Sequence, residues 1–243
     1  MHNAFLLRSM NEQTRVLFYI VIETPDSGAF EFLDISLKDS SEETFFYLPT
    51  SKNKEKSFYT AKNISLWNDK ETPSFSLEEL SQIKLESESF LFFSPLLDFS
   101  DQFELLIKQI EKEPAYEIGR VISFINAEEL LKGNSKLQSW LDAAAHFSDA
   151  LCITNRSNEN GKDVGKLLQR YEDMRYPLES YLISKSKRGK ISNILNPTPR
   201  RISHIFDSPE LLEAEDTPWK DPYLFELPNG RREKVIPMPF SRN

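Results

Sequence analysis

The sequence predicts an α/β protein with a mainly parallel sheet flanked by helices, followed by an extended, proline-rich C-terminal tail. Short apolar runs bounded by turn residues alternate four times with segments that have the apolar spacing of amphipathic helices. Such alternation is typical of a parallel sheet that is covered by helices. After residue 188 the periodicity ends, and the last 55 residues contain eight of the fourteen prolines.

In the first half of the chain, residues 15–22 (RVLFYIVI) form a largely apolar run that is followed by a proline and a glycine. This pattern predicts a buried central strand that leads into a turn. Apolar and aromatic residues predict further strands at 44–48 and 63–68. A serine with a glutamate three positions later is a capping box, which predicts a short helix at 76–82. The segment at 30–37 receives no assignment.

The second half repeats one pattern, a buried strand followed by a helix. Apolar runs predict the strands, and apolar residues three or four positions apart predict the helices. The expected strands are 90–93, 121–125, 150–154 and 179–183. The expected helices are 101–111, 127–131, 137–147 and 164–174. We expect the apolar runs at 15–22, 90–93, 121–125 and 150–154 to be neighbouring strands in the sheet.

We divide the chain into an α/β domain at residues 1–188 and an extended tail at 189–243. The tail is rich in proline but not uniformly polar, because aromatic residues recur along it. An extended segment of this kind is expected to lie on a surface, either that of its own domain or that of a partner. Both alternatives stay open. The aromatic anchors we expect are Phe206, Trp219, Tyr223 and Phe225.

Charge and composition limit the kinds of partner. The formal net charge of -8 disfavours nucleic acid and anionic membranes, which would repel an acidic surface. The longest apolar run is much shorter than the roughly 20 residues of a membrane helix, and no secretory signal is apparent. The one cysteine, Cys152, cannot form an intrachain disulfide. We therefore expect a cytoplasmic protein whose partner is an unknown protein.

The turn after the first predicted strand can be compared with a phosphate-binding P-loop, Gly-x-x-x-x-Gly-Lys-Ser/Thr. Gly28, which follows Ser27, stands at the second glycine of that pattern. Glu23 stands at the first glycine, while Ala29 and Phe30 stand at the lysine and the hydroxyl residue. A carboxylate and two apolar side chains would repel a triphosphate and leave its charge uncompensated.

Later segments carry a resemblance to the CobW-like GTPases and metallochaperones. The segment at 121–127 (VISFINA) resembles the family's strand that ends in Val-Asp-Ala, with Asn126 in place of the aspartate. The segment at 145–158 (AHFSDALCITNRSN) resembles the family's helix end, strand and guanine-reading Asn-Lys-x-Asp turn. Residues 92–98 stand where the family has the strand and loop before its switch. The resemblance covers residues 15–184 and implies a P-loop NTPase-like fold.

The same resemblance places a vestigial nucleotide site at Ser27, Gly28, Asn126, Asn155, Arg156 and Asn158. Asn158 replaces the aspartate that accepts hydrogen bonds from guanine, and Arg156 replaces the lysine that packs along the base. The family's metal-binding Cys-x-Cys-Cys motif has no counterpart in this sequence. The chain thus resembles a degenerate member, a pseudo-GTPase, for which we expect no catalytic residue, metal or cofactor.

Three function classes follow. The leading one is a non-catalytic, nucleotide-independent protein-interaction or scaffold protein. The second is a divergent GTP-binding protein or GTPase, in which Arg156, Lys162 or Lys166 supplies the missing positive charge. The third is a nucleic-acid accessory factor that uses the basic residues within 185–201, which the acidic net charge disfavours.

Overall fold

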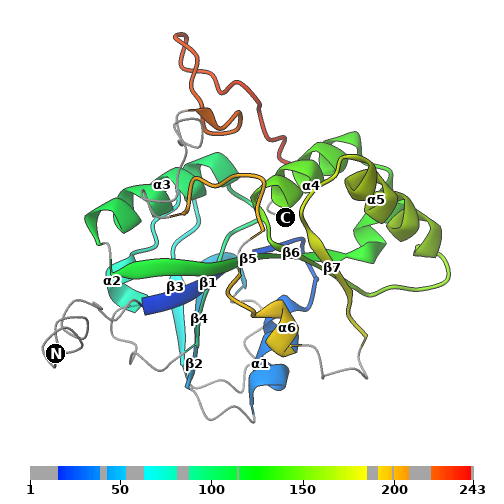
Figure 1. The fold of residues 1–243 in the computed structure, drawn as a ribbon, viewed down its shortest axis with the longest axis horizontal. Helices are drawn as coiled ribbons and strands as arrows, with labels where there is room; N and C mark the ends of the chain where they lie inside the picture. Colours follow the sequence, from blue (N-terminus) through cyan, green and yellow to red (C-terminus); the bar gives the residue numbers. More distant parts are fainter. Residues whose placement is uncertain are drawn as a thin grey trace, which may run out of the picture.

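The computed structural model describes residues 16–38, 43–52, 63–80, 88–113, 115–184, 191–198, 200–207 and 220–241. Within them, seven strands form one all-parallel sheet in the order β3-β2-β4-β1-β5-β6-β7 (Figure 1). The strands are β1 (Val16–Glu23), β2 (Thr44–Pro49), β3 (Ile64–Trp67), β4 (Glu88–Phe92), β5 (Tyr116–Asn126), β6 (Ala150–Thr154) and β7 (Glu179–Leu182). The predicted parallel sheet is confirmed, and the four apolar runs expected to be neighbours are β4, β1, β5 and β6, side by side.

Helices cover both faces of the sheet (Figure 1). One face carries α3 (Phe99–Lys112), α4 (Ser135–Phe147) and α5 (Gly161–Asp173), and the other carries α1 (Ala29–Leu37) and α6 (Ile191–Ile194). Two further short helices are α2 (Leu77–Leu80) and the 3-10 helix η2 (Ala127–Lys132). A sheet covered in this way needs strands that are apolar on both sides, which explains why their sequences do not alternate.

The central strand shows how the two layers of core are divided. Phe18, Ile20 and Ile22 of β1 face the layer that contains α3, α4 and α5. Tyr19 and Val21 face the layer that contains α1 and α6. Because successive side chains of a strand point to opposite faces, one apolar run contributes to both cores.

Four elements differ from the sequence prediction. The tail expected to be extended contains the short helix α6 (Ile191–Ile194). The unassigned segment forms α1, in which Phe30, Leu33 and Leu37 are buried at helical spacing. Strand β5 begins five residues earlier than the predicted run, at Tyr116 rather than residue 121. The helical segment predicted at 127–131 is a 3-10 helix rather than an α-helix.

The described parts of the tail pack against both faces of the sheet. Ile194 and Leu195 join the layer of α1, whereas Ile205 and Tyr223 join the layer of α3 and α4. The chain passes from one layer to the other beside the sheet (Figure 1). These parts of the tail therefore lie on the chain's own α/β body. Of the expected anchors, Phe206 packs against the Phe103 ring at a tilted angle, and Tyr223 is buried. Phe225 is half-buried, and Trp219 lies outside the described residues.

Buried polar contacts hold the tail in place. Asp149, just before β6, accepts hydrogen bonds from the backbone nitrogen atoms of Val121 (2.8 Å) and Arg201 (2.9 Å). The Arg201 guanidinium also pairs with this carboxylate at 2.9 Å, and both side chains are at most 2% exposed. Farther along the tail, Asp221 contacts His146 of α4 at 2.7 Å. His146 also packs against the rings of Phe147 and Tyr223. The tail boundary at 188/189 falls outside the described residues and stays a prediction.

We predict that Asp149→Ala lowers the free energy of unfolding by about 3 to 5 kcal/mol, because it leaves the buried Arg201 guanidinium without its main partner. Urea denaturation followed by circular dichroism measures the change. Asp173→Ala, which removes an exposed carboxylate at the end of α5, is the control and should change stability by less than about 0.5 kcal/mol. Equal effects of the two substitutions would contradict the assignment of Asp149 as a tail anchor.

Candidate functional site

The loops after β1, β5 and β6 meet at the carboxyl edge of the sheet, where parallel folds usually bind their ligands. The backbone nitrogen of Asn126 donates to Thr24 Oγ1 at 2.8 Å. Asn155 Nδ2 donates to the backbone oxygen of Asp26 and to Asn126 Oδ1, both at 3.1 Å. The structure thus brings together the turn at 23–28, Asn126 and Asn155, and ties them to one another.

Glu23 ends β1 with a carboxylate that points into the turn and is almost completely buried, with 3% of the residue exposed. Ser27 Oγ donates to Glu23 Oε2 at 2.7 Å and in turn accepts from the backbone nitrogen of Ala29 at 3.2 Å. Lys52, which lies beyond β2, forms an ion pair with Glu23 Oε1 at 2.5 Å. The turn therefore contains its own anion, and a lysine from another loop neutralises it.

The residues at the lysine and hydroxyl positions of the P-loop pattern belong to the core. Ala29 is fully buried and Phe30 is 1% exposed. The Phe30 ring packs against the Phe46 ring with centroids 4.9 Å apart. Gly28 is exposed and has a φ of 68°, a left-handed conformation that favours glycine. Positions 29 and 30 of this turn are thus occupied by packing residues and not by a cation and a hydroxyl group.

The turn after β6 is closed by Asn160. Its Oδ1 accepts from the backbone nitrogen of Ser157 at 2.8 Å, and its Nδ2 donates to the backbone oxygen of Asn155 at 3.0 Å. Asn155 itself has a φ of 51°. Arg156 and Asn158 are exposed on this turn and make no hydrogen bond or ion pair with any residue that the structure describes. They are the two predicted site residues that the structure does not join to the others.

Asp69 joins the remaining strands of the carboxyl edge. Its carboxylate accepts from Thr50 Oγ1 (2.9 Å), from both the backbone nitrogen (3.1 Å) and Oγ (2.6 Å) of Ser51, and from Ser94 Oγ (2.6 Å). Asp69 is 1% exposed. Burial opposes the charge, but these hydrogen bonds outweigh burial and hold the pKa of Asp69 below its usual value of 3.8.

The loop after β4 is closed by one side chain of α3. Gln102 Oε1 accepts from the backbone nitrogen of Ser94 at 2.8 Å, and Gln102 Nε2 donates to the backbone oxygen of Ser94 at 2.9 Å. Gln102 is fully buried. A loop whose backbone is held at both polar groups in this way has little freedom to rearrange.

Sequence reasoning placed Glu23 in the turn but missed the residues that hold it and its neighbours. Lys52 is the largest omission, because its ion pair joins loops 29 residues apart along the chain. The signal for Asp69 was available, because Asp69 directly follows the strand predicted at 63–68. Glu23 and Asn126 likewise stand at the ends of their strands. For Asn160 the signal was weaker, because asparagine is common before helices for capping alone.

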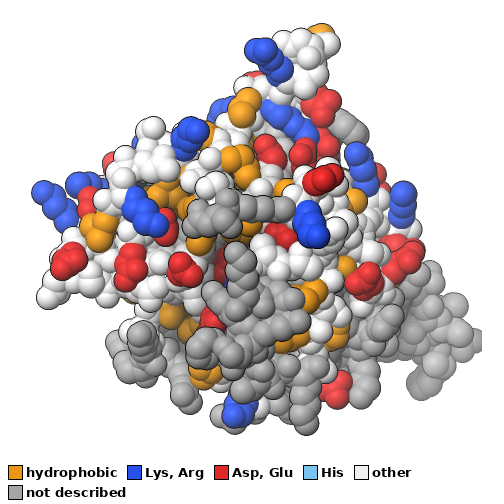
Figure 2. All heavy atoms as spheres, turned by 180° about the vertical axis from the view of Figure 1, so that it is seen from behind, with side chains coloured by type: hydrophobic (Ala, Val, Ile, Leu, Met, Phe, Trp, Pro, Cys, Tyr) orange, Lys and Arg blue, Asp and Glu red, His pale blue; other side chains and the backbone are white. Residues whose placement is uncertain are grey.

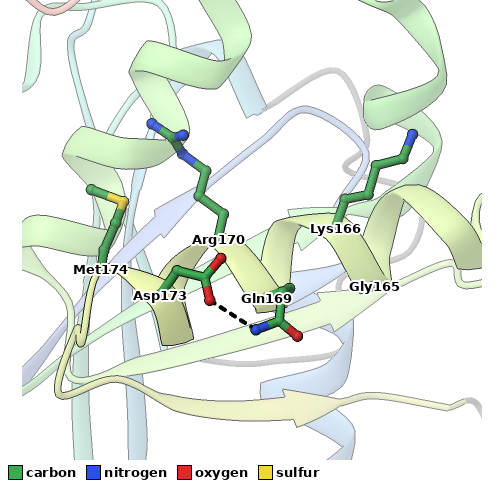
Figure 3. Close-up of a pocket in the computed structure, with 6 residues that line it drawn as sticks. All are labelled: Gly165, Lys166, Gln169, Arg170, Asp173 and Met174. Carbon is green, nitrogen blue, oxygen red and sulfur yellow. Dashed lines mark hydrogen bonds between the residues drawn. The ribbon is translucent and has the colours of Figure 1, made fainter.

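Two of the cations proposed to supply the missing positive charge lie on α5. Lys166 pairs with Asp163 at 2.7 Å, whereas Lys162 is exposed in the first turn. Arg170, also on α5, pairs with Asp142 of α4 at 2.7 Å. Lys166 and Arg170 line a shallow hollow with Gly165, Gln169, Asp173 and Met174 (Figure 3). All six residues lie on α5 or directly after it, so the hollow is a surface feature of one helix. In the basic segment, the structure describes Arg200 and Arg201, which pair with Glu179 and Asp149; residues 185–190 lie outside the described part.

Comparisons with known proteins show similarity to solved structures only. No protein-family model and no curated protein sequence matches the chain. A Zn(II)-bound triple mutant of the YjiA GTPase aligns with a TM-score of 0.47, and Zn(II)-bound YjiA GTPase from E. coli aligns with 0.43. Each is 10% identical to this chain, and each alignment covers 75% of this chain and 62% of the YjiA chain. At these scores the similarity identifies neither a family nor an activity.

Two further properties of the described residues concern membrane spans and metal sites. None of the helices in the described ranges is long and apolar enough to cross a membrane. Among the same residues, no group of three or more His, Cys, Asp and Glu side chains has a geometry that could hold a metal ion.

We predict that Asp69→Asn lowers the free energy of unfolding at neutral pH by about 2 kcal/mol, because hydroxyl groups then donate to a neutral amide instead of a charge. Since the pKa of Asp69 is lower in the folded protein, the unfolded chain binds the proton first as the pH falls. The difference between wild type and variant should therefore be constant above about pH 4 and shrink below it. Urea unfolding from pH 7 to pH 3 checks this, and a difference that does not change with pH would contradict it.

Proposed function

We propose that this chain is a non-catalytic, nucleotide-independent protein-interaction or scaffold protein, built on a P-loop NTPase-like sheet that resembles the CobW-like GTPases. The main support is the buried carboxylate of Glu23, which lies in the turn where a P-loop would bind phosphate. Ser27 and Lys52 are the groups there that suit a phosphate, and both contact this carboxylate.

The carboxylate of Glu23 opposes the binding of a triphosphate at this turn. A buried carboxylate beside an incoming triphosphate brings like charges together where little water screens them. If the triphosphate took Lys52 as its own partner, the Lys52–Glu23 ion pair would break. Glu23 would then be buried without its compensating charge, which is strongly unfavourable. Ala29 and Phe30, packed in the core, provide no replacement cation or magnesium ligand.

The ties between loops support a role that does not depend on a nucleotide cycle. A switch needs a segment with two arrangements that a ligand can favour differently. Here Gln102 holds the backbone at Ser94, Asp69 joins three strand ends, and Asn155 joins two other loops. The described carboxyl edge is thus a single hydrogen-bonded arrangement, suited to presenting a constant surface to a protein partner.

We predict that the purified protein binds Mg²⁺-GTP, Mg²⁺-GDP and Mg²⁺-ATP with dissociation constants above about 1 mM. Each lost charged contact costs about 1.5–3 kcal/mol, and two or three such losses exceed the roughly 4 kcal/mol that separates micromolar from millimolar affinity. Isothermal titration calorimetry measures the constants.

A micromolar constant for GTP would overturn this proposal. It would favour the divergent GTP-binding protein, for which the exposed, unpaired side chain of Arg156 is the supporting observation. In that case Arg156→Ala tests the role of Arg156, because the substitution should abolish GTP binding only if Arg156 contributes the missing charge. Glu159→Ala, a neighbouring exposed residue, is the matched control.

A further inference from the structure

A β-hairpin near the C-terminus projects from the body above α3 and α4 (Figure 1). Glu226 and Arg232 form an antiparallel bridge, and the backbone nitrogen of Leu227 donates to the oxygen of Arg231 at 2.7 Å. At the tip, Gly230 has a φ of 74° and its nitrogen donates to the oxygen of Leu227 at 2.8 Å. Proline, asparagine and glycine in succession suit this turn, so the sequence itself specifies the hairpin.

The base of the hairpin is fixed to α3 by Arg232. This guanidinium pairs with Glu104, contacts Asp101 at 3.3 Å, and donates to the backbone oxygen of Leu224 at 2.8 Å. Leu224 and Ile236, on the two strands at the base, are 4% and 3% exposed. The hairpin therefore projects at a defined position relative to α3 and is anchored by both charge and apolar packing.

Beyond its base, the hairpin exposes apolar side chains that do not contribute to the core. Val235 is 68% exposed and Leu227 is 37% exposed. In the view from behind, the hairpin rises from the molecule with charged side chains along it and around its base (Figure 2). The hairpin therefore holds two exposed apolar side chains at a defined position beside α3.

An apolar groove with an acidic rim lies between the hairpin base and α3. Ile107, Leu224 and Phe225 supply its apolar lining, and the charged residues that border it are Glu104, Lys108, Glu111 and Glu226. Glu104 and Glu226 are both paired with Arg232, Glu226 at 3.5 Å, whereas Glu111 has no ion-pair partner among the residues that the structure describes. Glu111 also lies in the last turn of α3, where the helix dipole disfavours a negative charge. A cation bound here would relieve that repulsion.

We propose that this groove and the adjoining hairpin form the docking surface for a cationic amphipathic segment of a partner protein. The proposal rests on the proposed function as an interaction protein and specifies its surface. Apolar side chains of the segment would pack on Ile107 and Phe225, while its Lys or Arg residues would face Glu111 and Glu226. The net charge of -8 would favour the approach of such a segment.

The probe is a synthetic amphipathic helix of about 18 residues, with Leu on one face and Lys on the other. Its counterpart carries Glu in place of Lys. Fluorescence anisotropy with the full chain should show binding of the Lys peptide, weakened by added salt, and no binding of the Glu peptide. Binding of both peptides alike, or of neither, would overturn the proposal.

Charge-reversal variants locate the binding surface. Glu111→Lys combined with Glu226→Lys should weaken the Lys peptide by about fivefold or more, because like charges then face each other. Glu111→Lys by itself, which leaves the contacts of Arg232 intact, should act in the same direction. Glu159→Lys combined with Glu172→Lys gives the same change in net charge on exposed residues elsewhere, and should leave binding within about twofold. An equal loss in this control would overturn the assignment to the groove.

A second copy of this chain is the competing occupant. Sedimentation velocity of wild type and of Leu227→Ser combined with Val235→Ser tests it. A wild-type monomer agrees with the proposal, whereas a wild-type dimer that the double variant dissociates would overturn it in favour of self-association. These outcomes are separate from nucleotide binding. Micromolar GTP affinity would overturn the proposed function alone, and failure of peptide binding would overturn the docking surface alone.

Discussion

Glu23 is a charged side chain that has been removed almost entirely from water at the end of the central strand, and the neighbouring loops are arranged around it. A buried carboxylate is tolerated only when hydrogen bonds and an opposite charge compensate for its lost hydration. Ser27 and Lys52 supply this compensation, so the turn after β1 and the loop after β2 depend on the same ion pair. The hydrogen-bonding and ion-pairing capacity of Ser27 and Lys52 toward this turn is thereby used within the protein.

The two edges of the sheet serve different purposes. At the carboxyl edge, short polar side chains join the loops to one another, and Asp69 and Asn155 each connect more than one loop. Toward the amino end of β6, Asp149 binds the tail as it passes from one helical layer to the other.

The sheet could be predicted because a parallel strand covered on both faces must be apolar throughout, and the run at 15–22 meets that condition. The adjacency of the turn at 23–28 to Asn126 and Asn155 followed from topology, since parallel strands end at one edge. Side-chain pairing could not be predicted in this way. The contact of Lys52 with Glu23 and that of Asp221 with His146 join residues far apart in sequence, and charge pattern does not identify such pairs. Helix α1 was missed although Phe30, Leu33 and Leu37 carry its spacing, because the segment is short and follows a turn.

The decisive measurement is the binding of inorganic pyrophosphate to the wild type and to Glu23→Gly, by calorimetry, on samples shown to be folded by circular dichroism. If the Glu23 carboxylate occupies the anion position of the turn, its removal should allow Lys52 and Ser27 to bind pyrophosphate. The expected dissociation constant is in the low millimolar range, which corresponds to a binding free energy of about 3 to 4 kcal/mol. Wild type should show no binding, and Lys52→Met added to Glu23→Gly should abolish it. Equal binding by wild type and Glu23→Gly, or no binding by a folded Glu23→Gly protein, would contradict the claim that Glu23 replaces a phosphate.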